Sequence, residues 1–195
     1  MLVFCDMRNH SLCLLALCVS LIAHAAPSAA PASLESRIAA QNTLFEEQYE
    51  SDLKATPERA TAFGDYRYND RLDEVSLAAL QSRHASDALF LARLDAIATD
   101  GFAEQDLLSH QVLQRTLKQR IANYGFKEYE MPVSQMDGPC THLADLPLAV
   151  PLDSVQHYQD YIARLRQIPR VFNQTQEVLR AGLKDHLMPV RFLLE

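Results

Sequence analysis

Apolar residues recur every three or four positions in successive runs from Ser33 onward, and this spacing is the strongest constraint on the fold. Residues three or four apart lie on the same side of an α-helix, so each run predicts one helix with an apolar stripe. The first run follows Ser33, the expected N-cap, and its stripe residues are Leu34, Ile38, Phe45, Tyr49 and Leu53. The sequence therefore predicts an all-α fold that begins with a helix of about five turns.

Two later runs predict an antiparallel helical hairpin. Their stripe residues are Leu77, Leu80, His84, Ala88, Leu91, Leu94 and Ala98, and then Leu107, His110, Leu113, Leu117, Ile121 and Tyr124. We interpret His84 and His110 as packed imidazoles with hydrogen-bond partners, because neither has a second histidine three or four residues away to share a metal ion.

Pro57 begins a short second helix between the first run and the hairpin, and Gly64 is expected near its end. Residues 63–74 then form a polar and aromatic connector that carries four acidic residues. The connector lacks the glycine and the final glutamate of an EF-hand calcium loop. We therefore expect a solvated connector rather than a calcium site.

Residues 126–152 form a long segment with no helical stripe. Four of the nine prolines and Gly138 fall here, and proline pushes its predecessor towards extended backbone. Irregular segments of this length within a domain are uncommon and often bind ligands. The segment also carries too many apolar residues for a solvated linker, so we expect it to pack across helices.

Helical spacing resumes at Asp153, the expected N-cap of a helix that Pro169 is expected to end. A last helix should run from there to Met188. The stripe residues are Val155, Tyr158, Ile162 and Leu165, and then Phe172, Thr175, Leu179 and Leu183.

Three arginines, Arg164, Arg166 and Arg170, lie in this part of the chain close to two tyrosines. They could bind a substrate carboxylate through paired N–H groups. We favour a simpler interpretation, in which they lie over apolar surface on a solvated helical face.

The amino-terminal residues have the pattern of a signal peptide. The apolar run at residues 11–23 is too short for a comfortable permanent membrane span, and small residues follow it. We predict a signal peptide at residues 1–25, a flexible leader at 26–33, and a periplasmic or secreted protein with no permanent span. Met7 starts a more conventional signal sequence than Met1, so we predict translation from Met7.

Charge and composition exclude several classes of function. The net charge of −7 repels nucleic-acid phosphates, so nucleic acid is not an expected partner. The chain has only five glycines and neither of the common phosphate-binding glycine motifs. Three of its four cysteines fall in the predicted signal peptide, which leaves Cys140 and no internal disulfide.

Cys140 and His142 could place a thiol beside an imidazole base, as a nucleophilic cysteine requires. No orienting residue or surrounding motif accompanies them, so a cysteine-dependent hydrolase is only a third option. The histidines also lack the spacing of a zinc site, and we expect neither a catalytic residue nor a metal ligand on this chain.

Several stretches together resemble the bacterial domain-of-unknown-function family 885. They are PERATAFGDYRYNDRLDE at 57–74, YEMPVSQMDGP at 129–139, LADLP at 143–147, VPLDSVQHYQDYIARLRQIP at 150–169 and LMPVRFLLE at 187–195. The resemblance implies exported or lipid-anchored, all-helical proteins that look like gluzincin-type zinc peptidases. In these proteins a His-Glu-x-x-Pro-Gly-His helix holds the zinc, and its glutamate acts as general base.

That zinc motif is absent from this sequence, so no catalytic or metal-binding role can be carried over. The resemblance implies a truncated N-terminal lobe, residues 34–195, that is inactive alone, while zinc and a peptide substrate belong to the full-length protein. Gln135, Asp137 and His142 are our candidate substrate contacts. The alternative is a stand-alone helical binding module of the cell envelope, which would need no metal.

Overall fold

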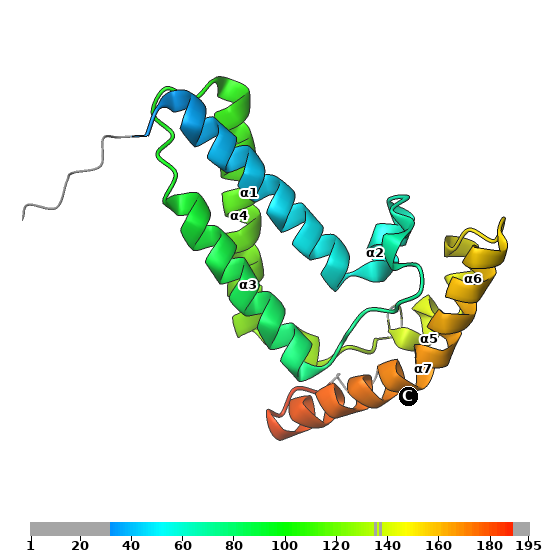
Figure 1. Ribbon diagram of the computed structural model, residues 1–195. Helices are drawn as coiled ribbons and strands as arrows, with labels where there is room; N and C mark the ends of the chain where they lie inside the picture. The colour runs from blue at the N-terminus through cyan, green and yellow to red at the C-terminus, as the bar shows by residue number, and fades with distance from the viewer. Residues whose placement is uncertain (1–31, 135, 137, 189–195) are drawn as a thin grey trace, which may run out of the picture. The chain divides into compact units, whose positions relative to one another are not determined.

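The computed structural model describes residues 32–134, 136 and 138–188, and within them it confirms the all-α prediction. Every regular element there is helical, and no strand occurs in the described part of the chain (Figure 1). The predicted signal peptide at residues 1–25 and most of the leader at 26–33 lie outside the described residues.

The amino-terminal half is built on three long helices: α1 (Leu34–Ala55), α3 (Leu77–Asp95) and α4 (Glu104–Gly125). The predicted hairpin is present as α3 and α4, and α1 packs against α3 (Figure 1). Ser33 caps α1 as expected, and Ser76 caps α3, each through a side-chain oxygen that accepts a backbone N–H. These two serine caps fix where the helices begin.

The core of this three-helix unit is a cluster of one leucine from each helix: Leu44, Leu94 and Leu117. A buried polar contact lies in the same unit, where the Gln41 side chain meets the His110 ring at 2.8 Å and donates to the Asp106 carbonyl at 3.1 Å. The prediction of a packed, hydrogen-bonded imidazole is therefore confirmed for His110.

The connector after α2 (Pro57–Ala62) is mostly exposed, as predicted, but part of it is buried. It contains the 3-10 turn η1 (Tyr66–Tyr68) and buries Asn69 and Leu72. The reason is that the side chain of Arg164, on α7 (Val155–Lys184), donates hydrogen bonds to connector carbonyls. Leu72 also joins a second apolar cluster with Leu146 and Val171.

The prediction that Pro169 ends a helix is wrong, because α7 runs from Val155 to Lys184 as one helix. A proline inside a helix removes one backbone hydrogen bond and bends the axis, but it does not always end the helix. Figure 1 shows that α7 is bent in its middle part, and Pro169 lies halfway along its sequence. The N-cap is Ser154, one residue after the predicted Asp153.

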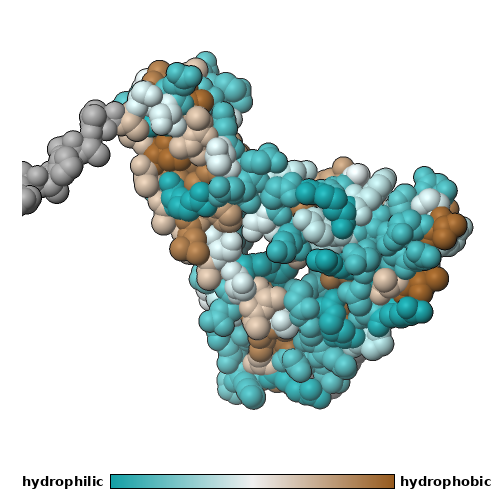
Figure 2. Space-filling view, in the orientation of Figure 1, coloured by the Kyte–Doolittle hydropathy of each residue, from teal (hydrophilic) through white to brown (hydrophobic). Residues whose placement is uncertain are grey.

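Most of the apolar stripe predicted for this part of the chain faces solvent instead of the core. Its exposed members range from Val155 at 76% to Leu165 at 38%, whereas Thr175 is buried and Leu179 half-buried. The buried positions are Arg164, Val171, Thr175, Val178 and Gly182. Figure 2 shows one mainly hydrophilic face of the molecule that is interrupted by separate hydrophobic patches. None of the described helices is both long and apolar enough to cross a membrane.

Segment 126–152 contains more helix than its sequence indicates. It forms the 3-10 turn η2 (Glu128–Glu130) and two single-turn helices, α5 (Pro139–His142) and α6 (Leu146–Ala149). Proline at the first or second position begins α5 and α6, where its missing N–H costs nothing. The segment packs on α7, as expected, through η2 and α5.

Gly182 allows η2 to approach α7, and its replacement by alanine is expected to destabilise the protein by about 1–3 kcal/mol. A Cβ atom at this position would lie 2.5 Å from the backbone carbonyl oxygen of Glu130, which has little room to move. Gly125→Ala is the matched control, because no atom lies within 4 Å of its added Cβ. Urea unfolding of both variants measures the difference, and equal stabilities would contradict the close approach.

Candidate functional site

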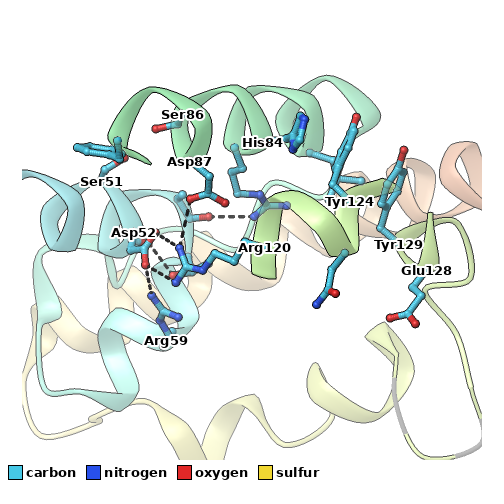
Figure 3. A pocket seen from close by; sticks show the side chains of 16 residues that line it. Ser51, Asp52, Arg59, His84, Ser86, Asp87, Arg120, Tyr124, Glu128 and Tyr129 are labelled. Atoms are coloured by element: carbon cyan, nitrogen blue, oxygen red, sulfur yellow. Dashed lines mark hydrogen bonds and ion pairs between the residues drawn. The ribbon is translucent and has the colours of Figure 1, made fainter. Parts of the chain in front are cut away.

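A cavity of about 450 Å³ lies among α1, α3, α4 and η2. Residues from these four elements line it, together with Arg59 of α2 (Figure 3). One part of the lining carries paired charges and another carries stacked aromatic rings. The cavity is therefore polar in one region and aromatic in another, as sites for small organic ligands often are.

The paired charges centre on Arg120, which Figure 3 shows between Asp52 and Asp87. Its guanidinium donates to both carboxylate oxygens of Asp52 at 3.0 and 2.8 Å and to Asp87 at 3.4 Å. Arg59 donates to Asp52 from the other side at 3.1 Å. Asp52 therefore has two arginine partners, whereas Asp87 shares Arg120.

These contacts move the pKa values of the two aspartates in opposite directions. Burial acts to raise the pKa of Asp52, but the hydrogen bonds and charge of Arg120 outweigh burial and leave this pKa below its ordinary value. Burial raises the pKa of Asp87, and the longer contact with Arg120 only partly offsets it. Hydrogen bonding to Asp52 in turn raises the pKa of Arg120.

The aromatic part of the lining is a stack of three rings. The His84 ring lies 4.0 Å from the Tyr124 ring, centroid to centroid, and Tyr124 lies 4.9 Å from Tyr129. Burial, together with the neighbouring Tyr124, raises the pKa of Tyr129 to about 12, so its phenol remains protonated at neutral pH. The predicted hydrogen-bond partner of His84 is not found, because its Nδ1 atom is buried and unpaired in the described structure.

A second cavity, of about 270 Å³, shares Leu80 and Tyr129 with the first. His142 lines it together with Glu58 and Asp73. The two carboxylates are held reciprocally: Glu58 N–H donates to Asp73 at 3.2 Å, and Asp73 N–H donates to Glu58 at 3.3 Å. Burial raises the pKa of both groups, and the charge of Asp73 raises that of Glu58 further.

The raised pKa values of Glu58 and Asp73 predict a loss of folding stability as the pH rises. A carboxyl group whose pKa is higher in the folded state stabilises the fold fully below its ordinary pKa, and this contribution disappears as the pH passes the raised value. Glu58→Gln resembles the protonated form. The free energy of unfolding of this variant should therefore fall less between about pH 4 and pH 8 than that of the unmodified protein.

Urea unfolding across this pH range measures that effect, with Glu46→Gln as the control. Glu46 is exposed on α1, so its replacement should leave the pH dependence unchanged. The lowered pKa of Asp52 has the opposite effect, because it lowers folding stability in acid. This effect is the same in the unmodified protein and in both variants, so it does not alter the comparison. Identical pH dependence for Glu58→Gln and the unmodified protein would contradict the prediction.

Among the residues proposed from the sequence, His142 ends α5 and lines the second cavity. Gln135 and Asp137 lie outside the described residues. Cys140 is exposed, and it does not line either of the two cavities.

Neither interpretation of the three α7 arginines holds for Arg164, which is fully buried and bonded to backbone carbonyls. Sequence reasoning also missed Glu58, Asp73 and Arg120. The polar character of PERATAFGDYRYNDRLDE was the only signal for the first two, and it was interpreted as solvation.

No group of three or more His, Cys, Asp or Glu side chains in the described part of the chain is arranged to hold a metal ion. The zinc that the resemblance implies therefore finds no fitting set of ligands among these residues, and we derive no chemical step through it. Glu58, Asp73 and His142, which share the second cavity, are not arranged as such a group.

A family model described as "Bacterial protein of unknown function (DUF885)" matches residues 57–195. This range begins at α2 and includes α3, α4, the segment 126–152 and α7. No curated protein matches the chain.

Proposed function

The chain belongs to the DUF885 family of bacterial proteins of unknown function, and on that premise we propose that it is the N-terminal helical lobe of an exported zinc-dependent peptidase. Its role is to bind the peptide substrate, while residues elsewhere in the protein hold the zinc. The predicted signal peptide supports export to the periplasm or the exterior.

The observation that carries this proposal is that one segment borders both cavities. Glu128 and Tyr129 line the first cavity, and Tyr129, Pro132 and His142 line the second. These residues come from the proline-rich segment 126–152, and loops held against rigid helices are common binding elements. A peptide lying along this segment would reach both cavities.

The exposed stripe on α7 supports the assignment as a lobe of a larger structure. Val155, Tyr158, Ile162 and Phe172 are all exposed along one side of the helix. A series of exposed apolar side chains of this kind is typical of a contact with another protein surface. The metal-holding part of the proposed peptidase would provide such a surface.

The test is the metal content and peptidase activity of the purified chain. We expect no stoichiometric zinc and no hydrolysis of a casein or peptide-library substrate, with or without added zinc. Tightly held zinc at one equivalent per chain, together with robust hydrolysis, would overturn the proposed division of roles. Hydrolysis that is lost on Cys140→Ala would instead support the cysteine-dependent option.

A further inference from the structure

The charges that line the first cavity are unequally satisfied. Both aspartates contact Arg120, and Asp52 also binds Arg59. Four of the charged side chains are therefore occupied with one another. These paired charges hold the walls of the cavity in place. The remaining polar residues of the lining are therefore the ones available to bind a ligand.

Arg83 is the cationic residue left over in this lining. It is half-buried on α3, and its guanidinium makes one long bond, of 3.4 Å, to the backbone carbonyl of Ala55. No ion pair of Arg83 within 4 Å is found among the described residues, in contrast to Arg59 and Arg120. Its charge acts over a longer distance on Asp73, where it partly offsets the rise in pKa that burial causes. A guanidinium presents several N–H donors in one plane, which match the two oxygens of a carboxylate.

His84, the next residue, adds a second group without a partner. Its Nδ1 atom is buried and makes no hydrogen bond in the described structure. Stacking on Tyr124 at 4.0 Å holds the ring, so the nitrogen is not free to turn towards water at low cost. A buried polar atom without a partner is costly, and a ligand that bonds to it removes that cost.

We propose that Arg83 and His84 bind the free carboxylate at the C-terminal end of a short peptide or acylated amino acid. The guanidinium donates to the carboxylate, and the Nδ1–H tautomer of His84 donates to its second oxygen. The half-buried side chain of Leu80, about one helical turn from His84, lines the same cavity and contacts an apolar terminal side chain. This inference rests on the proposed peptide-binding function and specifies which end of the peptide is recognised.

Isothermal titration of the full chain with N-acetyl-L-phenylalanine tests the assignment. Arg83→Met should weaken binding by about tenfold or more, the loss expected for a charge-assisted hydrogen bond. Arg83→Lys, which keeps the charge but loses the planar donors, should bind with intermediate affinity. Arg115→Met is the matched control: Arg115 is exposed on α4 and does not line the cavity, so binding should be unchanged.

Two further probes distinguish the carboxylate from other ligands. N-acetyl-L-phenylalaninamide, which has no carboxylate, should bind at least about tenfold more weakly than the acid. Inorganic phosphate also suits a guanidinium but lacks the apolar side chain, so it should compete at least about tenfold less effectively than the acid. Equal binding of acid and amide, competition by phosphate as strong as that by the acid, or no binding of N-acetyl-L-phenylalanine would each overturn the inference. The proposed division of roles is tested separately, by the zinc content and the hydrolytic activity of the purified chain. Near-ultraviolet circular dichroism checks that each variant is folded.

Discussion

Replacing Arg164 with methionine is expected to lower the free energy of unfolding by about 3–5 kcal/mol. The side chain is fully buried, and it donates to the carbonyls of Arg71 at 2.8 Å, Pro57 at 3.2 Å and Tyr68 at 3.3 Å. It also donates to the Thr61 hydroxyl at 2.5 Å. Methionine fills much of the volume but removes these four hydrogen bonds from the protein interior. It leaves the carbonyl of Arg71, which accepts from no other group among the described residues, unsatisfied, and such a group is costly.

The control for this variant is Arg166→Met, because Arg166 lies two residues away on the exposed side of α7. Its replacement should change stability by no more than about 0.5 kcal/mol. Urea unfolding of both variants gives the comparison. If Arg164→Met is as stable as Arg166→Met, Arg164 does not fix the connector to α7 as described.

Replacing Leu117 with alanine is expected to cost about 2–5 kcal/mol. Leu117 is fully buried, and with Leu44 and Leu94 it forms the cluster that joins the three long helices. Removing its branched end leaves a cavity that neighbours on three different helices can fill only partly, so lost burial and lost packing contribute together.

Leu108→Ala provides the matched comparison for Leu117→Ala. Leu108 belongs to the same helix but is exposed, so the same substitution should cost less than about 1 kcal/mol. Thermal unfolding measures both variants under identical conditions. Similar losses for the two leucines would mean that the cluster of Leu44, Leu94 and Leu117 is not the core of this unit.

The three-helix unit could be predicted from the sequence because its signals are local. Ser33 marks the start of α1, and the spacing of apolar residues predicts the hairpin of α3 and α4. Helix capping and helical period depend on residues within a few positions of one another, so no knowledge of distant contacts is needed.

The placement of α7 could not be predicted in the same way. Its most regular apolar stripe, which begins at Val155, is exposed, whereas the fully buried side chain nearby is Arg164. A buried arginine is tolerated only because carbonyls more than 90 residues away in the chain accept its hydrogen bonds. Sequence spacing carries no information about such partners, and hydrophobicity alone predicts the opposite orientation.

The candidate site could be predicted only in part, because it also depends on contacts between residues that are distant in the sequence. The composition of segment 126–152 predicted an irregular segment that packs across helices and is of a kind that often binds ligands, and its residues line both cavities. The pairing of Glu58 with Asp73 and the stacking of His84 on Tyr124 join residues that are 15 and 40 positions apart. Those contacts exist only once the helices are packed.

Hydrogen exchange of the full chain, with and without a short peptide that ends in phenylalanine, tests whether the two cavities bind peptide. If the two cavities form the peptide-binding site, the peptide should slow amide exchange in segment 126–152 and in the part of α3 that contains Leu80 and His84. Exchange in the first turns of α1 should not change. Slower exchange confined to other parts of the chain, or no change anywhere at millimolar peptide, would show that the two cavities do not form a peptide-binding site.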